Sequence, residues 1–154
     1  MPTIHMTTRY FALVVGIAFT LAGIAGFIPF FTPPPPIWAP PLTLNSNYGL
    51  LIGLFPVNAV HSVFHFCVGV YGMAAFRTYP SARQFSRFLG VTFAVLTVMG
   101  LIPTFHIHTT FGLLPLYGHD IWLHGLEAII GLYLGYSVRA DEPTVNSKAA
   151  DHVR

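Results

Sequence analysis

The sequence predicts an all-α fold, a bundle of four transmembrane helices. Charged residues make up 8% of the 154 residues, against about one-quarter in a soluble domain, and the mean hydropathy is +0.65. Two stretches, Tyr10–Phe76 and Phe88–Val138, contain no lysine or arginine. Each is long enough for two bilayer crossings, which need about 20 apolar residues apiece. The chain is therefore expected to form two membrane hairpins.

The first expected span covers residues 10–31. Three glycines recur along it, Gly16, Gly23 and Gly26. Small residues at such spacings typically let a neighbouring helix approach closely in a membrane. The run Pro33–Pro36 ends the span, because proline lacks the backbone N–H that a helix needs. This run predicts a stiff polyproline II segment outside the membrane.

The second and third expected spans cover residues 56–76 and 86–102. Pro56 suits the first turn of a helix, where its missing N–H is not needed. The basic segment Arg77–Arg87 is expected to form a short inner loop between the two spans. Pro103 ends the third span, which makes it the shortest of the four.

The fourth expected span covers residues 117–138, after an outer loop that carries His106 and His108. A polar tail, residues 139–154, follows it. We expect this tail, the N-terminus and the inner loop to be cytoplasmic, because every lysine and arginine falls on that side of the two hairpins and basic segments favour the cytoplasm. Those basic residues are Arg9, Arg77, Arg83, Arg87, Arg139, Lys148 and Arg154.

The two halves of the chain resemble one another. Gly53–Gly72 aligns with Gly112–Gly131 at a constant offset, with glycines and prolines at the same places relative to each span. Upstream, Gly26–Pro29 resembles Gly100–Pro103. These matches favour an internal duplication, which would give two parallel two-helix repeats related by an axis along the membrane normal.

The alignment also pairs polar residues within the second and fourth spans. His65 falls on His124, and His61 falls on Asp120. Equivalent residues of parallel repeats lie at the same depth in the membrane. We therefore expect His65 and His124 to approach one another, or to share one ligand, in the bundle interior.

Six polar residues occupy matching helix faces at spacings of three and four, which bring side chains together on one face. They are Asn58, His61 and His65 on the second span, and Asp120, His124 and Glu127 on the fourth. Ionisable groups at membrane depth are costly and normally face the bundle interior, so they are functional candidates.

Three interpretations of this polar core remain open. In the first it is a structural hydrogen-bond network, in which Asn58 caps or bridges backbone and Glu127 pairs with a histidine. In the second, His65 and His124, with His61 as a further candidate, bind haem or chlorophyll between facing helices. In the third, the histidines and carboxylates bind a metal ion, which the sequence does not specify.

Several segments resemble a bacterial four-span membrane family catalogued only as a domain of unknown function. The string from Gly53 to Gly69 carries its Asn-x-x-His-x-x-x-His pattern, and Gly26–Pro29, Gly100–Pro103 and Asp120–His124 resemble its other typical segments. The resemblance covers roughly Tyr10–Tyr136. It implies four spans in a bacterial inner or thylakoid-type membrane, and no activity, ligand or partner.

We expect a non-enzymatic membrane protein that is a subunit or scaffold of a larger membrane complex. Its partners would be the lipid bilayer and other membrane subunits, because the chain has little extramembrane sequence to hold a soluble substrate. A haem- or chlorophyll-binding protein and a metal-dependent membrane enzyme are the two alternatives. No phosphate-binding glycine loop, nucleophile elbow or basic nucleic-acid patch appears in the sequence.

Overall fold

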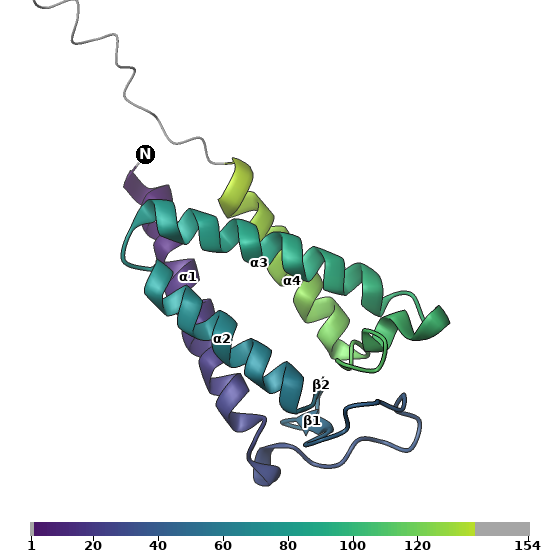
Figure 1. Ribbon diagram of the computed structural model, residues 1–154. Helices are drawn as coiled ribbons and strands as arrows, with labels where there is room; N and C mark the ends of the chain where they lie inside the picture. Colours follow the sequence, from purple (N-terminus) through teal and green to yellow (C-terminus); the bar gives the residue numbers. More distant parts are fainter. Residues whose placement is uncertain (1, 138–154) are drawn as a thin grey trace, which may run out of the picture.

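In the computed structural model, which describes residues 2–137, four main helices pack as two antiparallel pairs (Figure 1). The helices are α1 (Pro2–Ala25), α2 (Ala59–Ala75), α3 (Tyr79–Gly100) and α4 (His119–Leu132). Helix α1 packs along α2, and α3 packs along α4, while the two pairs meet mainly through α1 and α3. A π-helical turn, η3 (Tyr133–Ser137), continues α4. The expected all-helical core is therefore confirmed at the level of four paired helices.

The connections gather at the two ends of this bundle. The start of α1, the α2–α3 turn and the end of η3 lie at one end, and the two long connections lie at the other (Figure 1). Short elements order the long connections. These are the 3-10 helices η1 (Pro29–Phe31) and η2 (Thr104–Thr109), and an antiparallel hairpin of β1 (Gly49–Leu51) and β2 (Phe55–Val57).

The beginning of α2 differs from the expected start at residue 56. Pro56 lies in β2, opposite Leu50, and helix α2 begins at Ala59. Asn58 is the N-cap, because its extended backbone lets its side chain accept a hydrogen bond from the backbone N–H of His61. Asparagine is among the strongest N-cap residues, and this preference outweighs the weaker one for proline in the first turn.

Helix α3 also begins earlier than expected, at Tyr79 rather than near residue 86. Thr78 caps it by accepting from the backbone N–H of Ser81, and Pro80 fits the first turn. Most of the basic segment expected to be a loop is therefore helical, and α3, with 22 residues, is not the shortest helix. The polar tail, residues 139–154, lies outside the described residues.

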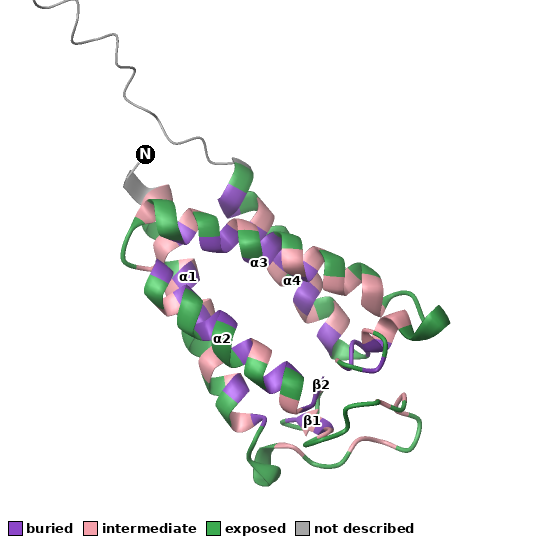
Figure 2. Cartoon of the chain, in the orientation of Figure 1, coloured by how far each residue is buried: buried purple, intermediate pink, exposed green. Residues whose placement is uncertain are grey.

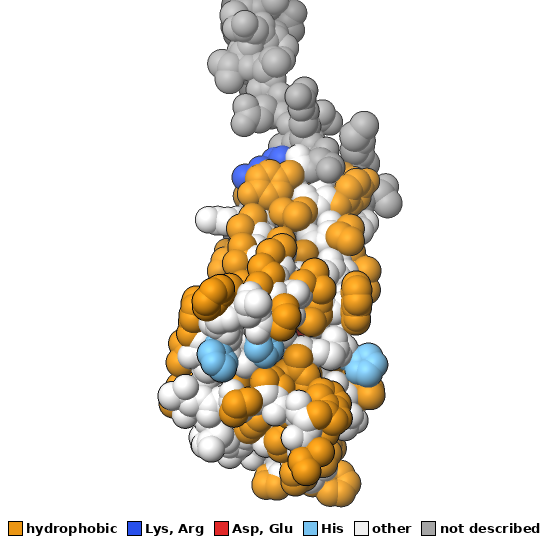
Figure 3. Space-filling view, turned by 90° about the vertical axis from the view of Figure 1, so that its right-hand side faces the viewer, with side chains coloured by type: hydrophobic (Ala, Val, Ile, Leu, Met, Phe, Trp, Pro, Cys, Tyr) orange, Lys and Arg blue, Asp and Glu red, His pale blue; other side chains and the backbone are white. Residues whose placement is uncertain are grey.

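The bundle has an apolar core that includes Phe85, Leu89 and Phe93, but it also exposes many apolar side chains and buries several polar ones (exposed and buried residues are coloured in Figure 2). All four helices expose large apolar side chains, among them Val14, Leu21, Val63, Phe66, Val91, Val95, Trp122 and Ile129. The buried polar residues are Thr8, Asn58, His61, Ser62, His65, Ser86, Thr109, Asp120 and His124. Figure 3 shows one side of the molecule covered mainly by hydrophobic side chains, with Lys and Arg side chains at one end.

One helical segment among residues 2–137, Ile4–Ala25, is both long enough and apolar enough to cross a membrane by length and hydropathy alone. Only 28% of its most apolar window is buried. Helix α2 is apolar but shorter, with 17 residues.

Each helix pair is built on a close glycine contact. A Cβ added at Gly16 would lie 2.6 Å from the backbone N of Met73, and one at Gly90 would lie 2.5 Å from the backbone N of Leu132. Gly90 is aligned with Gly16 by the offset that aligns Gly100 with Gly26, and Leu132 is aligned with Met73 by the offset between the two histidine helices. The close contact within each helix pair therefore falls at corresponding positions of the two halves.

Arginine side chains donate hydrogen bonds to the ends of α2 and η3 at corresponding positions of the two helix pairs. Arg9 Nε donates to the carbonyl of Phe76 at 2.8 Å. Arg83 Nε and Arg87 Nε donate to the carbonyl of Gly135 at 3.1 and 2.7 Å. The last carbonyls of a helix have no N–H donor within the helix, and these guanidinium groups provide the missing donors.

We expect Gly16→Ala and Gly90→Ala each to destabilise the protein by roughly 1–3 kcal/mol, because the added methyl group would press on rigid backbone. Gly125→Ala is the matched control. Its Cβ would lie 3.5 Å from the nearest atom, in ordinary contact, and alanine favours the helix by about 1 kcal/mol. Thermal unfolding followed by circular dichroism measures the difference. Equal melting temperatures for the three variants would contradict the close-contact account.

Candidate functional site

Asn58 anchors the start of α2 with all of its side-chain polar atoms engaged. Its Oδ1 accepts from the backbone N–H of His61 at 2.9 Å. Its Nδ2 donates to the carbonyls of Leu44 at 2.8 Å and Leu113 at 2.7 Å. Asn58 therefore ties both long connections to α2 and lies beside the histidines rather than among them.

His61 and His65 lie on successive turns of α2, and their ring centroids are 4.2 Å apart. Both side chains are buried. His61 Nδ1 lies 3.2 Å from the carbonyl oxygen of Pro56. Because a carbonyl only accepts, Nδ1 carries the proton in this contact and Nε2 keeps a free lone pair.

His124, on α4, brings the second helix pair to the same place. Its ring centroid is 6.0 Å from that of His61 and 6.5 Å from that of His65. One ring nitrogen from each of the three histidines lies within 4.8 Å of the other two. The alignment of the two halves thus correctly pointed to the meeting of His65 and His124, and His61 joins them.

Most of the ring nitrogens in this triad lack hydrogen-bond partners among the described residues. They are His61 Nε2, both nitrogens of His65 and both nitrogens of His124. His124 Nδ1 lies 3.5 Å from Asp120 Oδ2, which is within ion-pair distance but long for a hydrogen bond. A buried polar atom without a partner costs roughly 1–3 kcal/mol, so five at one place call for an explanation.

Two phenylalanine rings pack against the histidine triad. Phe93 stacks on His124 with centroids 4.5 Å apart, Phe19 packs against His65 at 4.8 Å, and the two phenylalanines meet at 5.3 Å. Sequence reasoning missed both residues, because aromatic residues are common in apolar helices. The offset that aligns Gly26 with Gly100 also pairs Phe19 with Phe93, and that signal could have identified them.

A cavity of about 270 Å³ adjoins the triad, bounded by α1, the β1–β2 hairpin and α4. Its lining is apolar except for His65, Asp120 and Glu127. Glu127 is half-buried, and its Oε2, like Oδ2 of Asp120, has no hydrogen-bond partner within residues 2–137. The expected pairing of Glu127 with a histidine is therefore not a hydrogen bond in this structure.

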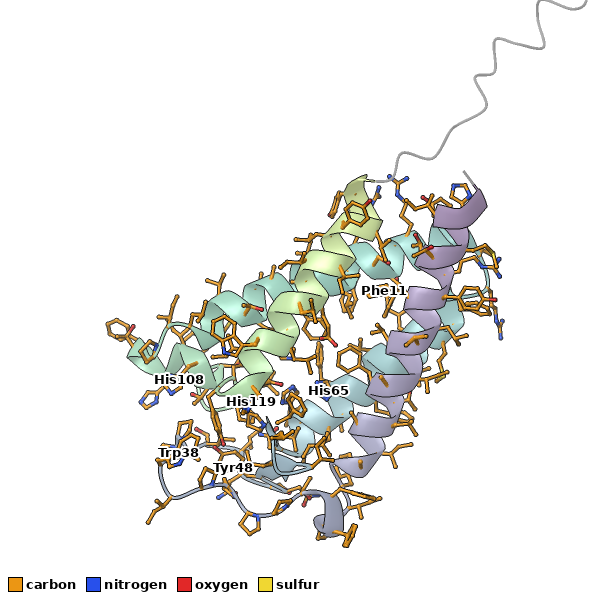
Figure 4. All side chains as sticks on the ribbon, turned by 180° about the vertical axis from the view of Figure 1, so that it is seen from behind. Phe11, Trp38, Tyr48, His65, His108 and His119 are labelled. Atoms are coloured by element: carbon orange, nitrogen blue, oxygen red, sulfur yellow. The ribbon has the colours of Figure 1, made fainter. Side chains whose placement is uncertain are left out.

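The other histidines between α3 and the start of α4 lie elsewhere. Figure 4 shows His108 and His119 at the loop end of the bundle with Trp38 and Tyr48, whereas His65 points between the two helix pairs. His106 lines a separate surface cavity with Phe105 and Phe111. None of these histidines contributes to the triad.

A family model described as a domain of unknown function (DUF4383) matches residues 9–137. No curated protein matches the chain, and no solved structure does. The match includes most of α1, all of α2, α3 and α4, and the three histidines of the triad.

We expect Asn58→Ala to destabilise the protein by roughly 3 kcal/mol, because it removes a helix cap and leaves two carbonyls without their donors. Asn45→Ala, at an exposed asparagine in the same connection, is the control and should change stability little. Chemical unfolding measures both variants. An Asn58→Ala protein as stable as the Asn45→Ala protein would show that these contacts are not needed.

Proposed function

The chain belongs to the DUF4383 family, whose function is unknown, and we propose that it is a four-span membrane protein that binds a transition-metal ion. His61, His65 and His124 would be the ligands. One observation carries the proposal: three buried imidazoles, from two helix pairs, bring ring nitrogens to within 4.8 Å of one another, and five of their six ring nitrogens form no hydrogen bond within residues 2–137.

The distribution of side chains supports a membrane location for all four helices. Exposed apolar residues on every helix would face lipid, and the buried polar residues would be shielded from it. Helix α2 is about 26 Å long at 1.5 Å per residue, close to a hydrocarbon thickness of about 30 Å. Helix α4 gains length from η3, which continues it to Ser137.

The positions of the arginines support a cytoplasmic location for one end of the bundle, the end opposite the two long connections. Arg9, Arg83 and Arg87 act at the end where α1 begins and η3 finishes. This is the end with the exposed basic side chains in Figure 3. Basic residues that flank membrane spans favour the cytoplasmic side.

The corresponding contacts of the two helix pairs support the proposed parallel repeats. The glycine contacts, the arginine caps and the Phe–His ring contacts all recur at the offsets that align the halves. In such an arrangement His65 and His124 occupy the same depth on either side of an axis along the membrane normal. An ion on that axis would join the two repeats.

The surroundings of the histidines also resemble those of metal ligands. A metal-binding histidine usually has its second ring nitrogen held by a backbone carbonyl or a carboxylate. His61 Nδ1 faces the carbonyl of Pro56, and His124 Nδ1 faces the carboxylate of Asp120. Each of these histidines can then direct its Nε2 to a shared ion.

Zinc is the ion that this set of ligands suits best. Three histidines with a fourth position left open are a common zinc arrangement, with Zn–N distances of about 2.0–2.1 Å. Tetrahedral bonds of that length place ligand nitrogens about 3.3 Å apart, so the rings would close inward from their present separations. Phe93 stacks on the His124 ring at 4.5 Å and the His61 ring lies 6.0 Å from it, so the rings crowd the triad on that side, which favours a bare ion over haem or chlorophyll.

The role of a subunit or scaffold in a larger complex stays a prediction. It is compatible with a metal site, because an ion that joins α2 to α4 would also stabilise the bundle. The same ion could support a reaction, since a zinc-bound water becomes a strong nucleophile.

We expect the purified protein to bind about one zinc ion per chain. His61→Ala, His65→Ala and His124→Ala should each weaken zinc binding by more than about tenfold, whereas His119→Ala, at an exposed histidine of α4, should not. Elemental analysis and competition with a chelator provide the measurement. Destabilised variants of a metal-free protein would support a hydrogen-bond network instead, and a Soret band lost in His65→Ala would support a tetrapyrrole.

Cysteine labelling tests the proposed orientation. In a Cys67→Ala background, Ile37→Cys should react with an impermeant maleimide added to intact cells, because Ile37 is fully exposed in the outer connection. Ser81→Cys, exposed near the start of α3, should react only after the membrane is permeabilised. Labelling of Ser81→Cys in intact cells would show that the orientation is wrong.

A further inference from the structure

We propose that the cavity between α1, the β1–β2 hairpin and α4 binds a small apolar molecule with a hydroxyl head group, an alcohol or a phenol. The hydroxyl oxygen would coordinate the metal ion and its proton would be donated to a carboxylate of the cavity wall. This inference rests on the proposed metal centre, and it names the class of ligand that the open position of that centre accepts.

The cavity wall has one polar side and is otherwise apolar. The apolar lining includes Ala22 of α1, Ile52 of the turn between β1 and β2, and Phe55 of β2. Its volume of about 270 Å³ lies just below the range of about 300–1,000 Å³ typical of small-molecule sites. The ligand body that fits is therefore small, of the size of one substituted aromatic ring.

The polar side of the cavity carries buried polar atoms that form no hydrogen bond within residues 2–137. His65 and Asp120 are 5% and 1% exposed; both ring nitrogens of His65 lack partners, and Oδ2 of Asp120 has only its long 3.5 Å contact with His124 Nδ1. Oε2 of Glu127 likewise forms no hydrogen bond in this part of the chain. Carboxyl oxygens accept hydrogen bonds, so a molecule with a hydroxyl proton can complete this wall.

The same wall distinguishes between head groups. A hydroxyl group has a proton for a carboxylate and lone pairs for a metal ion, so it can serve both at once. An acidic head group would find no cationic partner, because no lysine or arginine is among the residues that line the cavity. A quaternary ammonium group has no lone pair with which to coordinate the ion.

The cavity opens at the side of the bundle. Ala18 and Ile52, which line it, are exposed. In the proposed membrane orientation the side of the bundle faces lipid rather than water. The ligand would therefore enter from the bilayer, which suits a molecule with an apolar body.

Cobalt(II) provides a coloured substitute for zinc in the test. Protein loaded with one Co²⁺ ion is titrated with 4-propylphenol and, separately, with 4-propylanisole, which has a similar shape and no hydroxyl proton. We expect the phenol to shift the visible cobalt absorption in a saturable way and the anisole to leave it unchanged. Glu127→Gln should weaken the phenol effect at least severalfold while keeping the cobalt.

Two tryptophan variants on neighbouring positions of α1 test the location. Ala22→Trp would fill the cavity, so it should weaken the phenol effect more than tenfold, whereas Leu21→Trp, at a 61% exposed position outside the lining, should not. Ala22→Leu repeats the test with a smaller side chain if the tryptophan variant fails to fold, as judged by circular dichroism. Cobalt content is measured in every variant before the titration.

The results separate the two proposals. A protein that binds no cobalt overturns the metal centre and this inference together. A protein that binds cobalt but shows no phenol effect, or equal effects of phenol and anisole, overturns the hydroxyl ligand alone. An effect that survives both Ala22 variants places the ligand somewhere other than this cavity and equally contradicts the inference.

Discussion

The side chain of Asn58 sets the position of the site. By accepting from the His61 N–H, it fixes where α2 begins, and so it fixes which face His61 and His65 present. The residues before it remain extended, which leaves the Pro56 carbonyl facing back toward the His61 ring. Its two donated bonds hold both long connections against the same point. The amide of Asn58 thus binds both long connections and fixes the start of α2, and through that start it sets the contact between the Pro56 carbonyl and the His61 ring.

The four helices and the approach of His65 to His124 could be predicted from the sequence. Hydrophobic runs, the glycines and prolines at their ends, and the internal alignment are signals that extend over many residues. The helix starts could not be placed as well. Arg83 and Arg87 made the start of α3 resemble a loop, although Thr78 followed by Pro80 is a typical helix beginning. The β1–β2 hairpin carries no alternating pattern, since each strand has three residues. Such short pairing depends on tertiary context.

The chemistry of the site depends on where the two halves differ. If the two halves were identical, two histidines of one half would face two histidines of the other, or two carboxyl groups would face two carboxyl groups. Instead His61 aligns with Asp120, and Glu127 aligns with Val68. One half supplies a third imidazole and the other supplies two carboxyl groups. The positions at which the halves correspond build the frame of the site, and the positions at which they differ add an imidazole from α2 and two carboxyl groups from α4.

The arginine caps have a consequence for how this chain acquires its orientation. Arg9, Arg83 and Arg87 are the charges that an insertion machinery would read, and they are also the donors that hold the ends of α2 and η3. In the proposed orientation these charges would remain in the cytoplasm and would be available to the next helix as that helix returns. The side chains that direct insertion would then also close each hairpin, so replacing one of them would affect both the orientation and the packing of the chain.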